Sequence, residues 1–582
     1  MTAKKSDGPT AATRLTNIAL SRYTFGVSDT GEPYALPLDG PRIVKMLRGA
    51  GSLRAELAAA FLSDYGTPPP QQALADALMA LEGIALAQPA KALALRVADS
   101  HGALWLDLGD DTGELVKITP EGWQIVGEAP VLHRRTALTA ALPRPATEGD
   151  LSALRVLLNL APADWPVLMA FLVCALMPNM PHPILLLTGE HGTGKSTAAK
   201  IIGWVVDAST VPLRKPPRDL DSWTTAAIGS HVVAVDNLSN LQDWLSDALC
   251  RASTGDGDVR RRLYTDGDLH VVSFRRVVIL NGIDLGLLRD DLADRLVTVD
   301  LHRIEETERA EEVILTQRWQ AAAPLILGGL LDLTARVLAI LPSVHLERSP
   351  RMADFAHVLA AVDQLEGTDG LARYRKLGDE LAKDAAASDP VLVALTSTIS
   401  TPWEGVAADL LATLTWTLGD KRPPKGWPPS ARALTILLKR RAPSLRRIGW
   451  TIEQSERHTE KGMPWRIEPP SELLTNVLTK PDERPDEIGS SGVRQPVRQE
   501  SAPVLACEDV ESGQNPDELT KRTANLFSQD EKGKEGGANL EFADSSSVRQ
   551  FVTTTHCRAC GEPLAPVLIE DGERYHVGCE AG

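Results

Sequence analysis

The sequence lacks the features that direct a chain out of the cytoplasm or into a membrane. Met1 to Asn17 contain no apolar core of the kind found in signal peptides. The most membrane-like run, Trp165 to Met177, is too short to span a bilayer and is followed by Pro178, Pro181 and Pro183. We therefore expect a cytoplasmic protein with no membrane partner, in which this run forms a buried helix.

The sequence also contains few cysteines, and its net charge is negative. Six cysteines in 582 residues, without a secretory signal, do not predict a disulfide framework. The 61 basic and 77 acidic residues give a net charge of −16, so any contact with nucleic acid must come from local basic patches. The length predicts three or four folded units, and no repeat of fixed period is present.

The most specific pattern is I-L-L-L-T-G-E-H-G-T-G-K-S-T, at residues 184–197. An apolar run predicts a strand buried on both faces, and the residues after Ser196 have helical periodicity. Between them, G-x-x-x-x-G-K-S is typical of a phosphate-binding loop, in which backbone N–H groups and a helix N-terminus surround phosphate oxygens. We expect Lys195 to reach the β- and γ-phosphates of ATP and Ser196 to bind Mg²⁺. The expected nucleotide-binding residues are Gly189, Glu190, His191, Gly192, Thr193, Gly194, Lys195, Ser196 and Thr197.

Polar residues end the next two apolar runs. H-V-V-A-V-D-N reaches Asp236, which we expect to be the Mg²⁺-associated acid, and V-V-I-L-N ends at Asn281, which can orient the attacking water. Asn237 stands where most such ATPases have a second carboxylate, and an amide cannot accept a proton. We therefore expect either slow ATP hydrolysis or another residue as the general base that activates water, with Glu190 and Asp243 as candidates.

Arg295, in D-L-A-D-R-L-V-T-V-D-L, precedes a further apolar strand and has two interpretations. It can act as an arginine finger on the nucleotide of a neighbouring subunit, which requires an oligomer. It can instead form a salt bridge within the chain, with Asp291 or Asp294. We weigh the finger above the salt bridge, and a finger acting between subunits implies a ring.

A hairpin is predicted around T-D-G-D at residues 265–268, because strand-like runs flank this turn sequence. Arg260, Arg261, Arg262 and Tyr264 would offer cations and an aromatic ring to single-stranded DNA. A solvated strand face is an equally weighted alternative for these residues.

These motifs, in this order, resemble the superfamily 3 helicase type of AAA+ ATPase, found in viral, phage and plasmid replication. The resemblance covers about residues 180–303, and extends to about residue 470 in phage primase–helicase-like members. It implies an ATP-dependent DNA helicase or translocase that works as a homo-oligomeric ring, with ATP hydrolysed between subunits and the hairpin on single-stranded DNA. In that family Lys195, Ser196, Asp236, Asn281 and Arg295 would serve the nucleotide.

The expected fold is α/β, with a parallel-sheet AAA+ core and smaller flanking units. The expected units are 1–145, an α+β domain of unknown role; 146–304, the ATPase core; 305–388, helical; 389–470, winged-helix-like; 471–550, a disordered linker; and 551–582, a zinc-ribbon-like module. Residues 1–145 show no complete primase signature, and we interpret the acids Asp107, Asp110 and Asp111 as a solvated turn.

The winged-helix-like region has a basic helix that suits duplex DNA, although a packing helix with an exposed charged face is an equal alternative. Its basic residues are Arg432, Lys439, Arg440, Arg441, Arg446 and Arg447.

The carboxyl-terminal region contains C-x₂-C, fifteen residues, and then H-x₂-C. Two such pairs can supply four tetrahedral ligands to Zn²⁺, namely Cys557, Cys560, His576 and Cys579. We expect a structural zinc site that resembles small zinc-ribbon modules, with folding coupled to metal binding.

Two functions from different classes follow from these motifs. The first is the DNA helicase. The second is a nucleotide-switched DNA-binding initiator or loader with slow hydrolysis, which Asn237 favours. A defence ATPase triggered by foreign nucleic acid is a third class that uses the same core.

Overall fold

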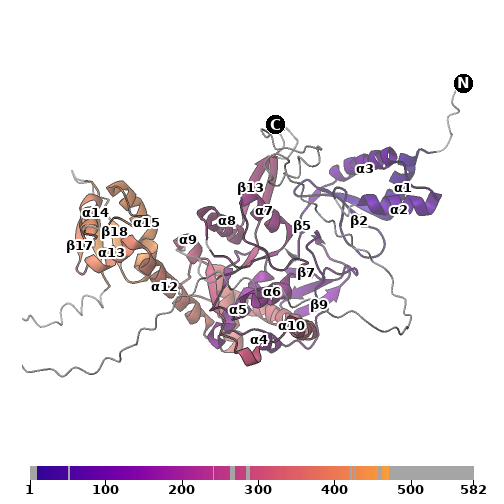
Figure 1. Ribbon diagram of the computed structural model, residues 1–582. Helices are drawn as coiled ribbons and strands as arrows, with labels where there is room; N and C mark the ends of the chain where they lie inside the picture. Colours follow the sequence, from indigo (N-terminus) through magenta and orange to yellow (C-terminus); the bar gives the residue numbers. More distant parts are fainter. Residues whose placement is uncertain are drawn as a thin grey trace, which may run out of the picture. The chain divides into compact units, whose positions relative to one another are not determined.

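The structure is a computed structural model (Figure 1). It describes residues 9–49, 53–239, 241–261, 269–282, 289–419, 422–424, 426–456 and 462–470. By its internal contacts the chain divides after Arg484, and every described residue belongs to the first unit. The linker and the zinc ligands that we expect therefore lie outside the described residues.

The amino-terminal part packs three helices against a small mixed sheet, in the order β3-β2-β1-β4. Its elements are α1 (Ala11–Arg22), β1 (Tyr23–Ser28), β2 (Pro33–Pro37), β3 (Lys45–Met46), α2 (Leu53–Tyr65), α3 (Gln71–Leu86) and β4 (Ala90–Lys91). The sequence pattern from Ile43 to Leu62 predicts a helical segment. This prediction is wrong in its first part, because Lys45 and Met46 pair with β2 and the helix begins at Leu53.

Strand-like runs that alternate with turns between Ala94 and Val126 predict a small β-rich meander. The structure confirms it as an antiparallel sheet with the strand order β6-β7-β8-β9. The strands here are β5 (Leu93–Ala94), β6 (Val97–Ser100), β7 (Ala103–Asp107), β8 (Leu115–Thr119), β9 (Gly122–Val126) and β10 (Leu132–His133). The buried side chains of the meander share one hydrophobic core with the helices beside the parallel sheet. The buried Arg96 fixes this junction, since its Nε donates to Asp207 Oδ1 at 2.8 Å.

The central sheet is entirely parallel, as predicted, with the order β12-β15-β11-β16. Its strands are β11 (Ile184–Thr188), β12 (Val232–Val235), β15 (Val277–Asn281) and β16 (Leu296–Asp300). Four helices flank it: α5 (Trp165–Ala175), α6 (Lys195–Val206), α7 (Leu220–Gly229) and α8 (Asp243–Thr254). Alternate residues of β11 enter two separate cores: Leu185 packs with α5 and α6, whereas Leu186 packs with α7 and α8. Burial on both faces explains why the strand sequence is continuously apolar.

The predicted hairpin is confirmed as β13 (Asp256–Arg261) paired antiparallel with β14 (Leu269–Phe274). Arg260 and Arg261 stand in β13 opposite His270 and Leu269. Arg262 and Tyr264 lie outside the described residues.

A helical region follows β16 and is dominated by one long helix, α10 (Glu312–Ile340). This region also contains α11 (Ala353–Glu366), α12 (Gly370–Ser388) and the short 3-10 helices η2 (Glu306–Glu308) and η3 (Leu341–Ser343). The segment before β11 contains α4 (Ser152–Leu157) and the 3-10 helix η1 (Pro162–Asp164), and α9 (Asp290–Ala293) lies between β15 and β16. Residues 146–151 run so close to α10 that a Cβ on Gly328 would lie 2.1 Å from Ala146 O. Glycine at this position permits the contact.

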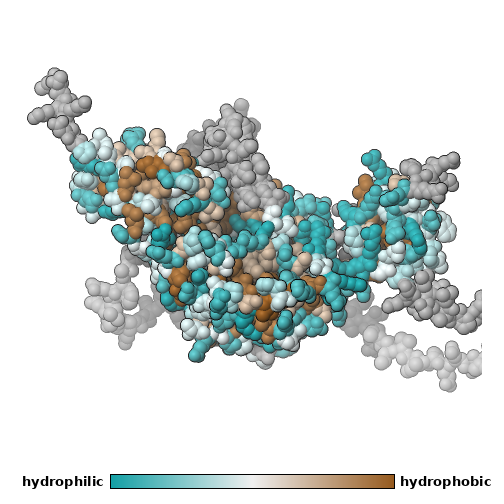
Figure 2. All heavy atoms as spheres, turned by 180° about the vertical axis from the view of Figure 1, so that it is seen from behind, coloured by the Kyte–Doolittle hydropathy of each residue, from teal (hydrophilic) through white to brown (hydrophobic). Residues whose placement is uncertain are grey.

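The length and apolar character of Glu312–Ser343 would suffice for a membrane span, so the prediction that Trp165 to Met177 is the most membrane-like run is wrong. In the structure, 56% of the most apolar window of this helix is buried, and α10 packs on α4, α5, α6, α11 and the meander. These contacts account for its apolar sequence as that of a core helix. Figure 2 shows hydrophobic side chains in small groups among hydrophilic ones over the face that it presents.

The last described region has its own hydrophobic core and the element order of a winged helix. The elements are α13 (Pro390–Thr398), β17 (Trp403–Val406), α14 (Ala407–Trp416), α15 (Ala431–Arg447), β18 (Thr451–Gln454) and β19 (Pro464–Glu468). The runs W-T-I-E-Q and W-R-I-E on either side of a polar turn predict a two-stranded hairpin. In the structure this hairpin is part of a three-stranded sheet, because β17 also pairs with β19. Trp450 and Trp465 are buried in this core.

Candidate nucleotide site

The loop between β11 and α6 has a backbone that requires glycine at three positions. Gly189, Gly192 and Gly194 have φ values of 138°, 82° and 75°. A Cβ on Gly189 would also lie 2.7 Å from Leu301 O. The glycines of G-x-x-x-x-G-K-S are therefore explained by the local geometry, and the loop leads directly into the N-terminus of α6.

Lys195, the first residue of α6, turns its ammonium group back into the loop. Its Nζ donates to Gly189 O and to Glu190 O, both at 2.7 Å. Burial lowers the pKa of Lys195 below its usual value. The positive charge is thus held where the loop closes around it.

Three side chains from separate segments meet beside the loop, at the carboxyl edge of the parallel sheet. Ser196 Oγ donates to Asp236 Oδ1 at 2.7 Å, and Asn281 Nδ2 donates to the same oxygen at 2.6 Å. Asn281 Oδ1 in turn accepts the backbone N–H of Asn237 at 2.6 Å. The carboxyl ends of parallel strands lie at the same edge of the sheet. Asp236, directly after β12, and Asn281, the last residue of β15, therefore come together there.

A cavity of about 450 Å³ opens over this cluster, a size that is typical of small-molecule sites. It is lined by His191, Gly192, Thr193, Gly194, Lys195, Ser196, Thr197, Asp236, Asn237, Asn281 and Gly282. Asn237 is exposed and has a left-handed backbone, with φ of 56°. Of the two candidate bases, Glu190 lies in the loop and its backbone oxygen accepts from Lys195 Nζ. Asp243 is an exposed residue at the start of α8.

The segment after β16 crosses the same loop, which the sequence did not indicate. A Cβ on Gly194 would lie 3.3 Å from Ile304 Cδ1, and one on Gly192 would lie 3.2 Å from Arg309 Nη2. Arg309 is exposed, and it forms no ion pair with the described side chains. A guanidinium group in this place adds positive charge to the mouth of the phosphate loop.

Arg295 lies at the amino end of β16, at the sheet edge opposite the loop of its own chain. Its Nη1 donates to Asp291 Oδ1 at 2.7 Å, and only 12% of its side chain is exposed. Arg351 pairs with the same carboxylate, and Asp294 accepts from Arg447 Nη1 at 2.9 Å. Within one chain, Arg295 is thus held in the salt bridge that was the alternative interpretation.

The six basic residues predicted around α15 fall into two groups. Arg432, Lys439 and Arg440 are exposed on the helix. The others have partners within the protein: Arg441 is buried with its Nε 3.3 Å from Asp389, Arg446 donates to Ile452 O, and Arg447 pairs with Asp294. Three of the six basic residues are therefore held in contacts within the protein.

The prediction that Asp107, Asp110 and Asp111 form a solvated turn is wrong for Asp107. Asp107 is buried and accepts two hydrogen bonds from Arg135, at 2.7 and 2.9 Å. Burial alone would raise the pKa of Asp107, but the Arg135 guanidinium holds it below its usual value. Asp110 is half-buried and accepts hydrogen bonds from the backbone N–H and the hydroxyl of Thr112, so the acids form an ion pair and a local turn. Among the described residues, no group of three or more His, Cys, Asp or Glu side chains is arranged to hold a metal ion.

Comparisons with solved structures find matches of low similarity, among them two helicases. The active helicase Cch of SCCmec type IV is 11% identical, with a TM-score of 0.39, over 78% of this chain and 95% of that chain. The NrS-1 C-terminal region is 12% identical, with a TM-score of 0.34, over 79% of this chain and 99% of that chain. The JCV helicase is 15% identical, with a TM-score of 0.20, over 40% of this chain and 64% of that chain. At these scores the likenesses carry no inference about fold or activity.

No curated protein sequence matches the chain. Two family descriptions do match it, in tandem. Residues 151–384 match the actinomycete integrative conjugative element replication protein, and residues 391–481 match the C-terminal domain of the same replication protein, RepA. The two segments together make up more than half of the chain, which thus belongs to the replication proteins of actinomycete integrative conjugative elements.

Proposed function

We propose that this replication protein is an ATP-dependent DNA helicase or translocase that acts in the replication of its mobile element. The observation that carries the proposal is the meeting of Ser196, Asp236 and Asn281 beside a glycine loop that ends in Lys195. This set combines a phosphate-binding loop, a carboxylate for a metal ion and an amide for water. It fits Mg²⁺ and the triphosphate of ATP.

Each residue has a separate part in the proposed reaction. The loop residues 189–197 bind the phosphates, and Lys195 neutralises charge on the β- and γ-phosphates. Ser196 Oγ and Asp236 are the groups that would hold Mg²⁺, which supplies further neutralisation when it is bound. Asn281 orients the attacking water, and Arg309 approaches the phosphates from the same chain.

Movement on DNA requires neighbouring subunits in this proposal. A homo-oligomeric ring would bring the β13–β14 hairpin, with Arg260, Arg261, Arg262 and Tyr264, to single-stranded DNA. Arg295 would leave Asp291 and reach the nucleotide of the next subunit. Such a ring would work in the cytoplasm.

The carboxyl-terminal parts would recruit the protein to its site. Exposed Arg432, Lys439 and Arg440 give α15 a basic face for duplex DNA. We propose that Cys557, Cys560, His576 and Cys579 bind one Zn²⁺. Metal analysis of the purified chain tests this: one zinc per chain is expected, and Cys560→Ser should remove it. An unchanged zinc content in that variant would contradict the assignment.

Strand separation on a forked DNA substrate tests the helicase proposal. The wild-type chain should separate the strands only with Mg²⁺-ATP, and Lys195→Ala should have no activity. Thr210→Ala is a suitable matched control, since this exposed hydroxyl bonds Ala137 O and follows the end of α6 that is opposite the loop. Unwinding by Lys195→Ala at the wild-type rate would refute the proposal.

A nucleotide-switched initiator or loader is the second candidate, and one observation favours it. Asn237 is exposed in the cavity at the place of a catalytic carboxylate, and its amide cannot take a proton from water. In this case ATP binding would drive assembly on DNA, hydrolysis would be slow, and the forked substrate would stay intact.

A further inference from the structure

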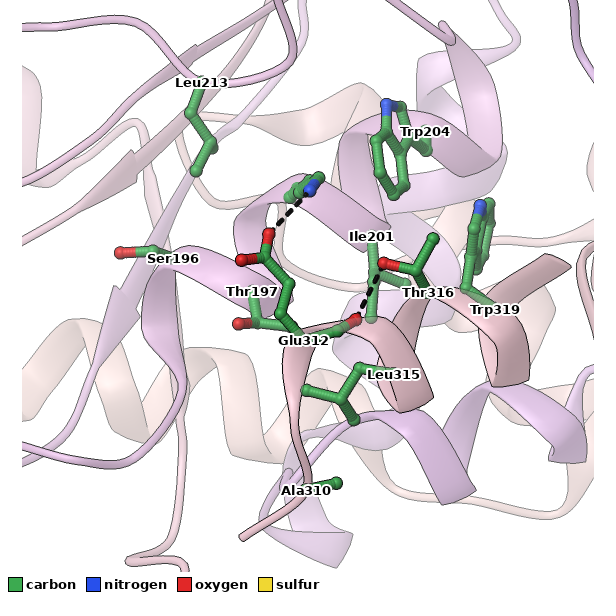
Figure 3. A pocket seen from close by; sticks show the side chains of 11 residues that line it. Ser196, Thr197, Ile201, Trp204, Leu213, Ala310, Glu312, Leu315, Thr316 and Trp319 are labelled. Atoms are coloured by element: carbon green, nitrogen blue, oxygen red, sulfur yellow. Dashed lines mark hydrogen bonds and ion pairs between the residues drawn. The ribbon is translucent and has the colours of Figure 1, made fainter. Parts of the chain in front are cut away.

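A second cavity, of about 360 Å³, begins at the first turn of α6 and continues away from the phosphate loop (Figure 3). Its lining consists of Ser196, Thr197, Lys200, Ile201, Trp204, Leu213, Ala310, Glu312, Leu315, Thr316 and Trp319. Ser196 and Thr197 also line the cavity over the loop. A molecule whose phosphates lie in the loop can therefore extend along α6 into this second space.

The walls of the second cavity are mostly apolar and aromatic. Trp204 of α6 and Trp319 of α10 are stacked, with ring centroids 5.9 Å apart and an interplanar angle of 27°. Ile201 and Leu315 add aliphatic side chains from the same two helices, as Figure 3 shows. Trp204 lies two helical turns beyond Thr197, about 10 Å along the axis. A flat ring at this depth would meet indole and aliphatic surfaces.

Five of the eleven lining residues are polar, and the only carboxylate among them is open to water. Lys200 Nζ lies 4.6 Å from the centroid of the Trp204 ring and 3.5 Å from Glu312 Oε1. The Glu312 side chain is 86% exposed. Thr316 Oγ1 already donates to Glu312 O. An exposed carboxylate that has an ammonium partner gives weak readout of the edge of a base, because water competes for its hydrogen bonds.

We propose that this cavity takes the purine base of the nucleotide, and that Trp204 and Trp319 recognise it by its ring surface and not by its polar edge. The inference rests on the proposed function, since it assumes that the phosphates bind in the loop. It assigns the base site to the α6–α10 junction and predicts that adenine and guanine are both accepted. A pyrimidine offers one ring in place of two and binds less tightly.

The test measures the dissociation constants of ATP, GTP, UTP and inorganic tripolyphosphate, each with Mg²⁺, on the full chain. ATP and GTP should differ by less than about ten-fold, because edge hydrogen bonds exposed to water discriminate little. Trp204→Ala should weaken ATP and GTP by about ten-fold or more, the usual effect of losing a stacking partner. It should leave tripolyphosphate, which has no base, unchanged.

Two further variants make the result specific. Trp204→Phe keeps an aromatic ring and should restore most of the affinity for ATP. Trp416→Ala removes a tryptophan that is 85% exposed on α14 and should change no dissociation constant. Unchanged ATP affinity in Trp204→Ala, or equal weakening of ATP and tripolyphosphate, would overturn the base site. If wild type binds none of the probes, the proposed function fails together with it.

Discussion

The hydroxyl of Ser196 donates a hydrogen bond to Asp236 Oδ1 across 2.7 Å, although 40 residues separate the two in sequence. This bond joins the first turn of α6 to the residue that follows β12. Asn281 reaches the same oxygen from the end of β15. Two donors of the protein therefore hold the Asp236 carboxylate beside the loop, an arrangement suited to a preorganised site.

Asp236→Asn should lower the turnover of ATP by about 100-fold or more, because the amide removes the charge that stabilises a metal ion. The affinity for Mg²⁺, taken from the dependence of turnover on its concentration, should fall as well. Asp409→Asn, at an exposed position in the first turn of α14, is the matched control. Equal turnover in Asp236→Asn and wild type would remove Asp236 from the site.

Arg309→Ala should raise the KM for ATP by about ten-fold, because one charged hydrogen bond to phosphate is lost. Arg303→Ala is the control, since it removes the same charge from an exposed residue of the same segment. A similar change in both variants would indicate a general effect of charge. No change in either would place Arg309 outside the nucleotide site.

The strand, the loop and the helix around Lys195 could be predicted because their signals are local. The strand is continuously apolar, the three glycines adopt backbones that other residues avoid, and a helical period follows. The hairpin could also be predicted, from T-D-G-D between two strand-like runs. The signals that predict these elements come from residues close together in the sequence.

Arg309 and the Trp204–Trp319 pair could not be predicted, since each depends on a long-range contact. Arg309 meets Gly192 only because β16 lies beside β11 and directs the following segment across the loop. Trp204 and Trp319 have the pattern of ordinary core residues on two helices, and they meet only when α10 packs on α6. The sharing of one core by the meander and the helices beside the parallel sheet is likewise a tertiary feature.

Asn237→Glu should change kcat by less than about three-fold if the protein is a motor with another base, because one extra carboxylate then adds little. A large gain would support the slow switch. The left-handed backbone at residue 237 disfavours glutamate, so Asn237→Gly is the control for strain. Asn237→Asp adds a carboxylate that tolerates this backbone, and it should agree with the glutamate variant in direction.

The folded chain should lose stability on mild acidification, because burial lowers the pKa of His133 to about 4. An unfolded imidazole takes a proton near pH 6.5, so between about pH 6.5 and 4 only the unfolded state binds it. The free energy of unfolding therefore falls as the pH decreases through this window. Burial also lowers the pKa of His182 and of His231, which adds to the effect.

Urea denaturation at pH 7 and at pH 5 measures this dependence. His133→Asn removes one titrating group and should make the midpoint less sensitive to pH. His302→Asn, which changes an exposed histidine, should keep the wild-type dependence. Identical pH dependence in wild type and His133→Asn would contradict the assignment to His133.

The most direct test of the central claim is steady-state ATP hydrolysis with and without single-stranded DNA, with Lys195→Ala as the blank. The helicase account predicts Mg²⁺-dependent turnover that DNA stimulates strongly and that the variant lacks. Turnover equal to that of Lys195→Ala, in the presence of DNA, would contradict it.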